Sequence, residues 1–181
     1  MEYIEQAIKG VYVITPKRFG DDRGYFSETF KQDEFESIVG KINFIQDNES
    51  YSSNGVLRGI HFQYGEYAQA KLVRVVEGSV LDIAVDLRKD SETFGKYVAV
   101  ELSEQNGKQL FIPRGFGHAF LVLSDTAKFI YKVDNVYAPE YEGSIIYNDK
   151  DINISWPKIE IKLSEKDKYG ITLQEYTKKE I

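Results

Sequence analysis

The sequence contains no cysteine, only two histidines and no long hydrophobic run. The absence of cysteine excludes disulfides, thiolate nucleophiles, iron–sulfur clusters and zinc sites built on cysteine. The two histidines, His61 and His118, limit any metal site. No run of about 18 apolar residues is present, so we expect no membrane-spanning helix. The first residues lack the basic and then apolar order of a secretion signal, and we expect a cytoplasmic protein.

Positive charge is also scarce. Lysine and arginine total 23 against 29 aspartates and glutamates, which gives a formal net charge of −6 at pH 7. An acidic surface argues against non-specific binding to nucleic acid, but a few local arginines and lysines could still hold a small anion. The 181 residues suit one domain over 1–181, which is large enough to bury a core without disulfides.

Strand patterns follow one another through the middle of the sequence. Apolar residues alternate along 80–88, and Glu77-Gly78 interrupts the run from 72 to 87 as a hairpin turn does. Further strand patterns, separated by turn sequences, span 97–102, 108–112, 118–123 and 128–133. Helices are predicted only over 33–40 and from Ser164 onward. Together with the 13 tyrosines and 11 phenylalanines, these patterns predict an all-β sandwich or barrel.

A turn motif precedes the second histidine. Pro113 and Gly115 form a tight turn in Gly107-x5-Pro113-x-Gly115-x2-His118 and can direct His118 to the inner face of a barrel. This spacing resembles the second motif of the cupin superfamily. Metal-binding cupins usually pair it with an earlier His-x-His, whereas this sequence has His61-Phe62-Gln63. Because iron and zinc sites generally need three or four ligands, we expect no catalytic metal.

Two further stretches could carry chemistry. Residues 46–63 are dense in polar groups, and a strand that directs Arg58 and His61 into one cavity could bind an anion beside a base. The alternative is a polar loop that leads into an edge strand. In residues 21–30, Phe26, Glu28 and Phe30 alternate as in a strand, so Glu28 would lie among apolar neighbours and need a partner.

Ten short motifs occur in one order between Arg23 and Pro157, and the match to one known family extends around them from about Ile4 to Asp167. They are Arg23-Gly24-x-Phe26-x-Glu28, Gln46-x-Asn48-x-Ser50, Gly55-Val56-Leu57-Arg58-Gly59-x-His61, Lys71-Leu72-Val73, Asp86-Leu87-Arg88, Ile112-Pro113-x-Gly115-Phe116-x-His118-x-Phe120, Tyr131-Lys132, Tyr137-x-Pro139, Asn148-Asp149 and Trp156-Pro157. By these motifs the sequence closely resembles the dTDP-4-dehydrorhamnose 3,5-epimerase family, cupin-like enzymes of nucleotide-sugar synthesis. The resemblance implies a double-stranded β-helix, or jelly roll, with a few short helices.

The resemblance also implies an activity. Such an enzyme inverts C3 and C5 of dTDP-4-dehydro-6-deoxy-D-glucose, the carbons beside the C4 ketone, and yields dTDP-4-dehydro-L-rhamnose for deoxysugar synthesis. Removing a proton alpha to a carbonyl requires a positioned base, an acid on the opposite face and stabilisation of the enolate oxygen. Family resemblance further implies no metal or other cofactor, a dTDP-sugar as the ligand, no nucleic-acid or membrane partner, and a homodimer that exchanges N-terminal strands.

By motif match, His61 is the base, Asp167 the carboxylate that pairs with it, and Tyr131 the acid. Lys71 lies in the sugar site and helps to stabilise the C4 oxyanion. The other substrate-binding positions implied by the match are Arg23, Phe26, Glu28, Gln46, Asn48, Arg58, His118, Glu142 and Tyr137, whose ring would stack on the thymine.

Several of these residues could instead have purely structural roles. Asp167 could complete a capping box with Ser164, and Tyr131 could be an ordinary sheet aromatic. Arg23 and Arg58 could make surface ion pairs. At the level of function, the alternatives are an epimerase acting on C3 or C5 alone, a 3,4-ketoisomerase, a metal-dependent cupin and a non-catalytic sugar-binding module.

Overall fold

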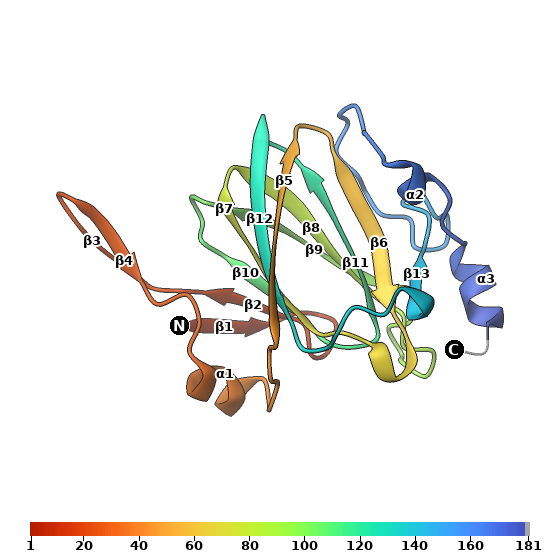
Figure 1. The fold of residues 1–181 in the computed structure, drawn as a ribbon, viewed down its shortest axis with the longest axis horizontal. Helices are drawn as coiled ribbons and strands as arrows, with labels where there is room; N and C mark the ends of the chain where they lie inside the picture. The colour runs from red at the N-terminus through yellow and green to blue at the C-terminus, as the bar shows by residue number, and fades with distance from the viewer. Residues whose placement is uncertain (180–181) are drawn as a thin grey trace.

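Two antiparallel β-sheets pack face to face in the computed structural model, which describes residues 1–179 (Figure 1). The first sheet has six strands in the order β1 (Glu2–Glu5), β2 (Tyr12–Thr15), β10 (Gln109–Ile112), β7 (Lys71–Glu77), β12 (Thr126–Val133) and β5 (Gln46–Ser53). The second has five, in the order β13 (Glu142–Ser144), β6 (Leu57–Gln63), β11 (Phe116–Val122), β8 (Ser79–Asp86) and β9 (Tyr97–Ser103). Except for β1 with β2 and β8 with β9, strands that are neighbours in these two sheets are not consecutive in sequence, so the chain crosses repeatedly between the sheets. The predicted cupin-like jelly roll is therefore confirmed.

The predicted turn between β7 and β8 is present. Gly78 has φ +76°, and a Cβ atom there would collide with the carbonyl oxygen of Thr126. Only glycine accepts this backbone and this close approach. The strands on either side begin and end where the alternation of apolar residues predicts, at Lys71–Glu77 and Ser79–Asp86.

Alternate residues of the strands fill the space between the sheets. Val73, Phe129, Ala84 and Phe120 come from both sheets and form one buried cluster. Each fully buried valine or phenylalanine side chain stabilises the fold by about 1.5–3 kcal/mol. A second cluster covers the other face of the five-stranded sheet, where the C-terminal segment packs Ile152, Leu173 and other residues against it. This segment contains two short helices, α2 (Glu165–Lys168) and α3 (Leu173–Lys178).

A short helix, α1 (Gln32–Ile38), lies near the predicted range 33–40 and covers one end of the six-stranded sheet. Phe35 is fully buried there, with its ring centroid 5.2–5.6 Å from those of three other phenylalanines, Phe30, Phe44 and Phe111. No helix within residues 1–179 is long and apolar enough to cross a membrane.

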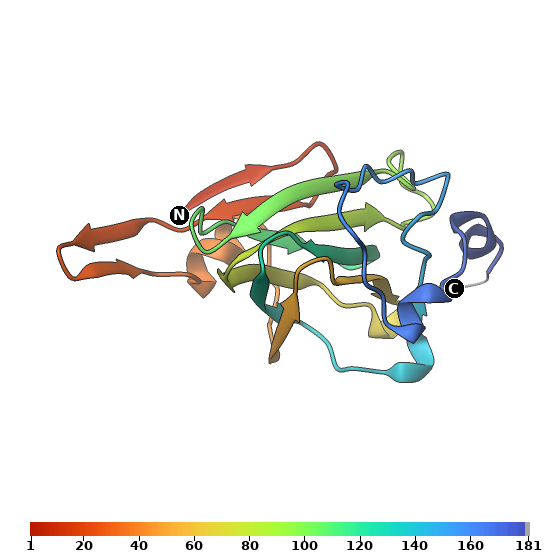
Figure 2. The ribbon, with the colours of Figure 1, turned by 90° about the horizontal axis from the view of Figure 1, so that it is seen from above.

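A two-stranded hairpin, β3 (Arg18–Asp21) and β4 (Gly24–Ser27), projects from one end of the molecule (Figure 2). Its aromatic side chains are exposed, with 67% of the Phe26 surface accessible. The expectation that Glu28 lies among apolar neighbours is wrong: β4 ends at Ser27 and Glu28 is exposed. The alternation predicts a strand, but β3 and β4 pair with each other and join neither of the two large sheets of their own chain.

Candidate functional site

A cavity of about 320 Å³ opens between the two sheets, beside β5 and β6. Seven of the residues that we singled out in the sequence line it, namely Gln46, Asn48, His61, Lys71, Tyr131, Tyr137 and Glu142. Phe62, Gln63 and Gln69 complete the lining. Strand period explains part of this set, because Gln46 and Asn48 are two residues apart on β5 and therefore point to the same face.

His61 and Asp167 form a close pair in this site. His61 Nε2 lies 2.5 Å from Asp167 Oδ1, and only 4% of the Asp167 side chain is exposed. Since a carboxylate accepts hydrogen bonds, Nε2 carries the proton and donates it, and Nδ1 is left with a free lone pair. The pair therefore presents a neutral imidazole with one nitrogen able to accept a proton.

Ser164 holds the other oxygen of Asp167. The Ser164 hydroxyl donates to Asp167 Oδ2 over 2.6 Å and accepts the backbone N–H of Asp167 over 3.2 Å. Ser164 is thus the N-cap of α2, as the capping alternative predicts, while Asp167 also contacts His61. Both carboxylate oxygens are engaged, so the carboxylate has a single orientation.

The electrostatic surroundings keep His61 neutral. Burial lowers the pKa of His61, and the ammonium groups of Lys71 and Lys166 lower it further, while Asp167 opposes these effects. A pKa below the ordinary value leaves the imidazole unprotonated at neutral pH. Such a group can act as a general base.

Tyr131 lines the same cavity from the opposite sheet, in register with Asn48 of β5. Burial raises the pKa of Tyr131, although the nearby Arg58 guanidinium acts in the other direction. The hydroxyl is therefore protonated at neutral pH and can act as an acid. Arg58 Nε donates to Ser52 Oγ over 3.2 Å and so joins β6 to β5 at the edge of the site.

Lys71 reaches into the cavity from β7. Burial lowers its pKa from 10.5 to about 8, while the carboxylates of Asp82 and Glu142 raise it. No hydrogen bond or ion pair to its ammonium group occurs among residues 1–179. The cavity therefore contains a cation whose hydrogens are available to a ligand.

His118 lies directly opposite His61 on the neighbouring strand β11. It is not among the residues that line the cavity. Its Nε2 lies 3.0 Å from Asp82 Oδ2, and its ring stacks on Phe129 with centroids 5.9 Å apart. The histidine predicted to bind substrate is thus held by a fully buried carboxylate just behind the cavity.

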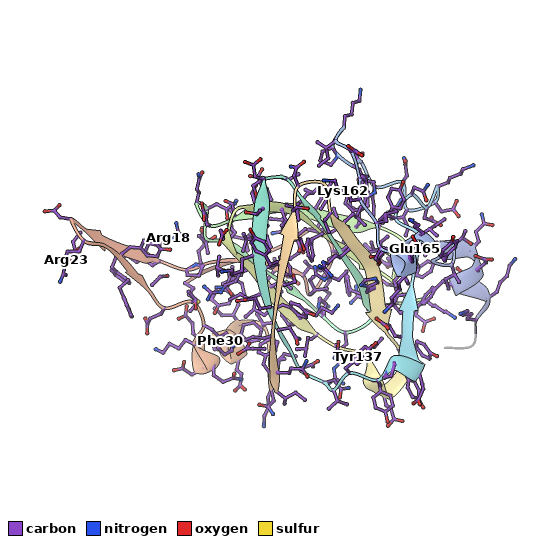
Figure 3. All side chains as sticks on the ribbon, turned by 45° about the horizontal axis from the view of Figure 1, so that its top comes forward. Arg18, Arg23, Phe30, Tyr137, Lys162 and Glu165 are labelled. Carbon is purple, nitrogen blue, oxygen red and sulfur yellow. The ribbon has the colours of Figure 1, made fainter. Side chains whose placement is uncertain are left out.

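Three predicted binding residues lie away from the cavity of their own chain. Arg23, Phe26 and Glu28 belong to the projecting hairpin or follow it. Figure 3 shows Arg23 at one end of the molecule and Tyr137 toward the other. The Arg23 side chain is 89% exposed, and within residues 1–179 its one ion pair is with Asp21, 2.5 Å away. Within one chain these three residues cannot contact a ligand beside His61.

Several residues at the site were missed in the sequence. Lys166 Nζ lies 2.6 Å from Glu142 Oε2, which also accepts a hydrogen bond of 3.0 Å from the Tyr137 hydroxyl. Burial acts to raise the pKa of Glu142, but these two hydrogen bonds outweigh it and lower that pKa. Gln63 was detectable, because strand period places it on the same face as His61. Nothing local in the sequence indicates the Lys166 contact.

No group of three or more histidine, aspartate or glutamate side chains in the described part of the chain is arranged to hold a metal ion.

The sequence and the fold of this chain are similar to those of known proteins. The family model described as dTDP-4-dehydrorhamnose 3,5-epimerase matches residues 5–175. A dTDP-4-dehydrorhamnose 3,5-epimerase from Shigella flexneri is 53% identical over 171 residues, which cover 94% of each chain. The crystal structure of such an epimerase from Elizabethkingia anophelis is 49% identical, covers 97% of both chains and superposes with a TM-score of 0.93. A dTDP-6-deoxy-D-glucose-3,5-epimerase from Legionella pneumophila, solved with dTDP-4-keto-L-rhamnose, is 44% identical with a TM-score of 0.92, and the match covers 96% of this chain and 93% of that one.

Proposed function

This chain belongs to the dTDP-4-dehydrorhamnose 3,5-epimerase family and is an isomerase of that type, and we propose that His61, Tyr131 and Lys71 carry out its reaction. The substrate is dTDP-4-dehydro-6-deoxy-D-glucose, and inversion at C3 and C5 gives dTDP-4-dehydro-L-rhamnose. The observation that carries the proposal is the cavity itself. It places a neutral imidazole and a protonated phenol on opposite sheets, with a free ammonium group beside them.

Each inversion needs one proton to leave and another to arrive on the opposite face. His61 Nδ1 removes the proton from C3 or C5, and the electron pair of that bond moves toward the C4 oxygen to form an enolate. Tyr131 then donates its hydroxyl proton to the same carbon from the other face. Exchange with solvent returns a proton to Tyr131 and removes one from His61. Asp167 stabilises the imidazolium that forms in between, because its carboxylate contacts Nε2 directly.

Lys71 stabilises the enolate oxygen. A positive charge in a cavity from which water is partly excluded acts strongly on a developing negative charge. With a pKa of about 8, Lys71 is mostly protonated at pH 7. Lys71 loses its charge as the pH rises through about 8, which should set the alkaline limit of the reaction.

Other side chains at and beside the cavity bind the substrate. Tyr137 is 58% exposed, and its ring is free to stack on the thymine base. Gln46 and Asn48 offer amide groups to the sugar or diphosphate, and Arg58 supplies a forked donor for a phosphate oxygen. His118 is held by Asp82 just behind the cavity and does not line it, so its predicted contact with the substrate requires the sugar to reach past the residues that line the cavity.

The projecting hairpin supports a homodimer. A groove of about 550 Å³ adjoins the cavity and shares Asn48 and Tyr131 with it. The hairpin of a second copy in this groove would bring Arg23, Phe26 and Glu28 to the cavity. An isologous dimer would then complete both sites at once. The exposure of the aromatic residues on the hairpin, unusual for a free surface, supports this arrangement.

Solvent-deuterium incorporation tests the reaction. The protein is incubated with dTDP-4-dehydro-6-deoxy-D-glucose in heavy water, and NMR reads C3 and C5 separately. Deuterium at both carbons, with formation of the L-rhamno sugar by a coupled reductase, is the expected result. Label at one carbon would identify a single-centre epimerase. Binding of the substrate without label would refute the acid–base assignment.

Mixing two inactive variants tests the dimer. The His61→Ala protein keeps an intact hairpin, and the Arg23→Ala protein keeps an intact base. If the hairpin completes the partner site, heterodimers contain one intact site of two, and random mixing restores about a quarter of the wild-type activity. A mixture that stays as inactive as its components would refute this arrangement. A cytoplasmic location, which the sequence suggests, is checked by cell fractionation.

A further inference from the structure

The loop that carries Tyr137 is fastened by side-chain amides. Two chain segments, 63–70 and 134–141, lie side by side here. Gln69 Nε2 donates to the carbonyl oxygen of Asn135 over 2.8 Å, and Asn135 Nδ2 donates to that of Glu66 over 2.8 Å. Each amide thus bonds to the backbone of the opposite segment. Rigidity of this loop comes from a small number of identifiable hydrogen bonds.

Gln63 makes the central contacts. Its Nε2 donates to the carbonyl oxygens of Val136, at 3.0 Å, and Tyr67, at 2.7 Å. Its Oε1 accepts the backbone N–H of Ala138 at 2.8 Å. One side chain therefore holds the residues immediately before and after Tyr137. Gln63 is itself 8% exposed, so these hydrogen bonds compete little with water.

Tyr137 has little other support. Its ring is largely exposed, and its only side-chain hydrogen bond within residues 1–179 goes from the hydroxyl to Glu142. The direction of the ring is consequently set by the backbone on either side of it. Gln63 also lies two residues after His61 on the same face of β6, so it connects the base to the ring through one rigid strand.

We propose that Gln63 is a positioning residue that fixes Tyr137 at the distance from His61 which a nucleoside diphosphate sugar requires, and thereby determines affinity for the nucleoside. This inference rests on the proposed function, in which Tyr137 stacks on the base. It predicts that losing the Gln63 amide weakens nucleotide binding through Tyr137 and leaves the chemistry at His61 largely unchanged.

A double-mutant cycle on dTDP binding tests the proposal. Isothermal titration calorimetry measures the Kd of dTDP for the wild type, Gln63→Met, Tyr137→Ala and the double variant. Methionine keeps the length of the side chain but removes all three hydrogen bonds. We expect Tyr137→Ala to weaken binding about tenfold, as loss of a base-stacking ring does. Gln63→Met should weaken it about fivefold alone and less than about twofold in the Tyr137→Ala background.

Three controls separate positioning from general damage. Inorganic pyrophosphate, which lacks the base, should bind wild type and Gln63→Met equally. The Gln174→Met variant makes the same exchange at an exposed position of α3 and should bind dTDP like the wild type. In turnover, Gln63→Met should raise KM about fivefold and leave kcat within about twofold. If Gln63→Met does not fold, Gln69→Met repeats the test, because Gln69 bonds to Asn135 and Val136.

Equal loss of dTDP affinity in both backgrounds, parallel loss of pyrophosphate binding, or no loss at all would overturn the proposal. Failure of the proposed function is distinguishable from each of these. It would appear in the wild type as dTDP binding without deuterium incorporation, whereas the cycle depends on binding alone.

Discussion

Replacing Lys71 with methionine should make this protein more stable and far less active. The wild-type chain keeps an ammonium group in a partly buried cavity, where burial lowers its pKa from 10.5 to about 8. A tenfold change in an ionisation equilibrium corresponds to about 1.4 kcal/mol, so the charged lysine costs the fold about 3 kcal/mol at pH 7. Methionine removes this cost and fills a similar volume.

The stability that Lys71→Met adds depends on pH over a defined range. Below pH 8, Lys71 is protonated in both the folded and the unfolded chain, and the whole cost is present. As the pH rises from 8 to 10.5, the folded chain holds a neutral amine while the unfolded chain is still charged, and the cost disappears. The advantage of Lys71→Met over wild type should therefore be about 3 kcal/mol at pH 7 and about half of that at pH 9.5.

Activity should move in the opposite direction. Lys71→Met removes the charge that stabilises the enolate oxygen, and kcat should fall by about 10²–10³. In the wild type, kcat/KM should fall about tenfold per pH unit above pH 8, because only the protonated ammonium acts. The methionine variant should lack this alkaline limb.

Urea denaturation at pH 7 and pH 9.5, with turnover measured over the same range, checks this prediction. Lys150→Met is the control, because Lys150 is exposed and its loss should change the free energy of unfolding by less than about 0.5 kcal/mol. A Lys71→Met protein that is less stable than wild type at pH 7, or whose advantage is the same at both pH values, would refute the reasoning.

Three further predictions concern the acid–base residues. Asp167→Asn should lower kcat by about 10²–10⁴ through loss of imidazolium stabilisation, with dTDP affinity unchanged by calorimetry; near-normal kcat would show that His61 works alone. Tyr131→Phe should stop inversion while deuterium still enters the substrate through His61, as NMR can distinguish; continued inversion would require another acid. Ser164→Ala should lower the free energy of unfolding by about 1 kcal/mol, as loss of an N-cap does, and should also reduce kcat because Asp167 loses the bond that orients it. A stability loss with unchanged kcat would limit Ser164 to capping.

The strands could be predicted because their signal is local. Alternating apolar residues and a glycine turn define β7 and β8 almost to the residue. The same reasoning was wrong for Glu28, since alternation shows that a strand exists but not what it packs against. The hairpin leaves the body of its own chain, which is a tertiary property that local pattern does not contain.

The site likewise contains some features that local sequence predicts and others that depend on the tertiary structure. Residues 46–63 were recognisable from their polar density, and the resemblance to a family indicated Asp167. Local sequence alone favoured a helix cap for Asp167, and the structure shows the cap and the His61 contact together. Strand period places Gln63 on the same face as His61, but its hydrogen bonds to the loop of Tyr137 could not be predicted, and nor could the contact of Lys166, because both depend on which distant part of the chain lies next to them. Such pairings arise only when residues far apart in sequence are folded together.

The pair of His61 and Asp167 joins positions 106 residues apart in the sequence. During synthesis at about 5–20 residues per second, the base is translated roughly 5–20 seconds before its carboxylate. The segment that carries Asp167 also covers the five-stranded sheet, so translation of this segment supplies both part of the core and the carboxylate that contacts His61. A nascent or prematurely terminated chain that ends before residue 167 consequently contains the histidine without the carboxylate that stabilises its charged form. If His61 and Asp167 have the proposed roles, a chain that ends before residue 167 should remove the sugar proton far more slowly than the longer chain.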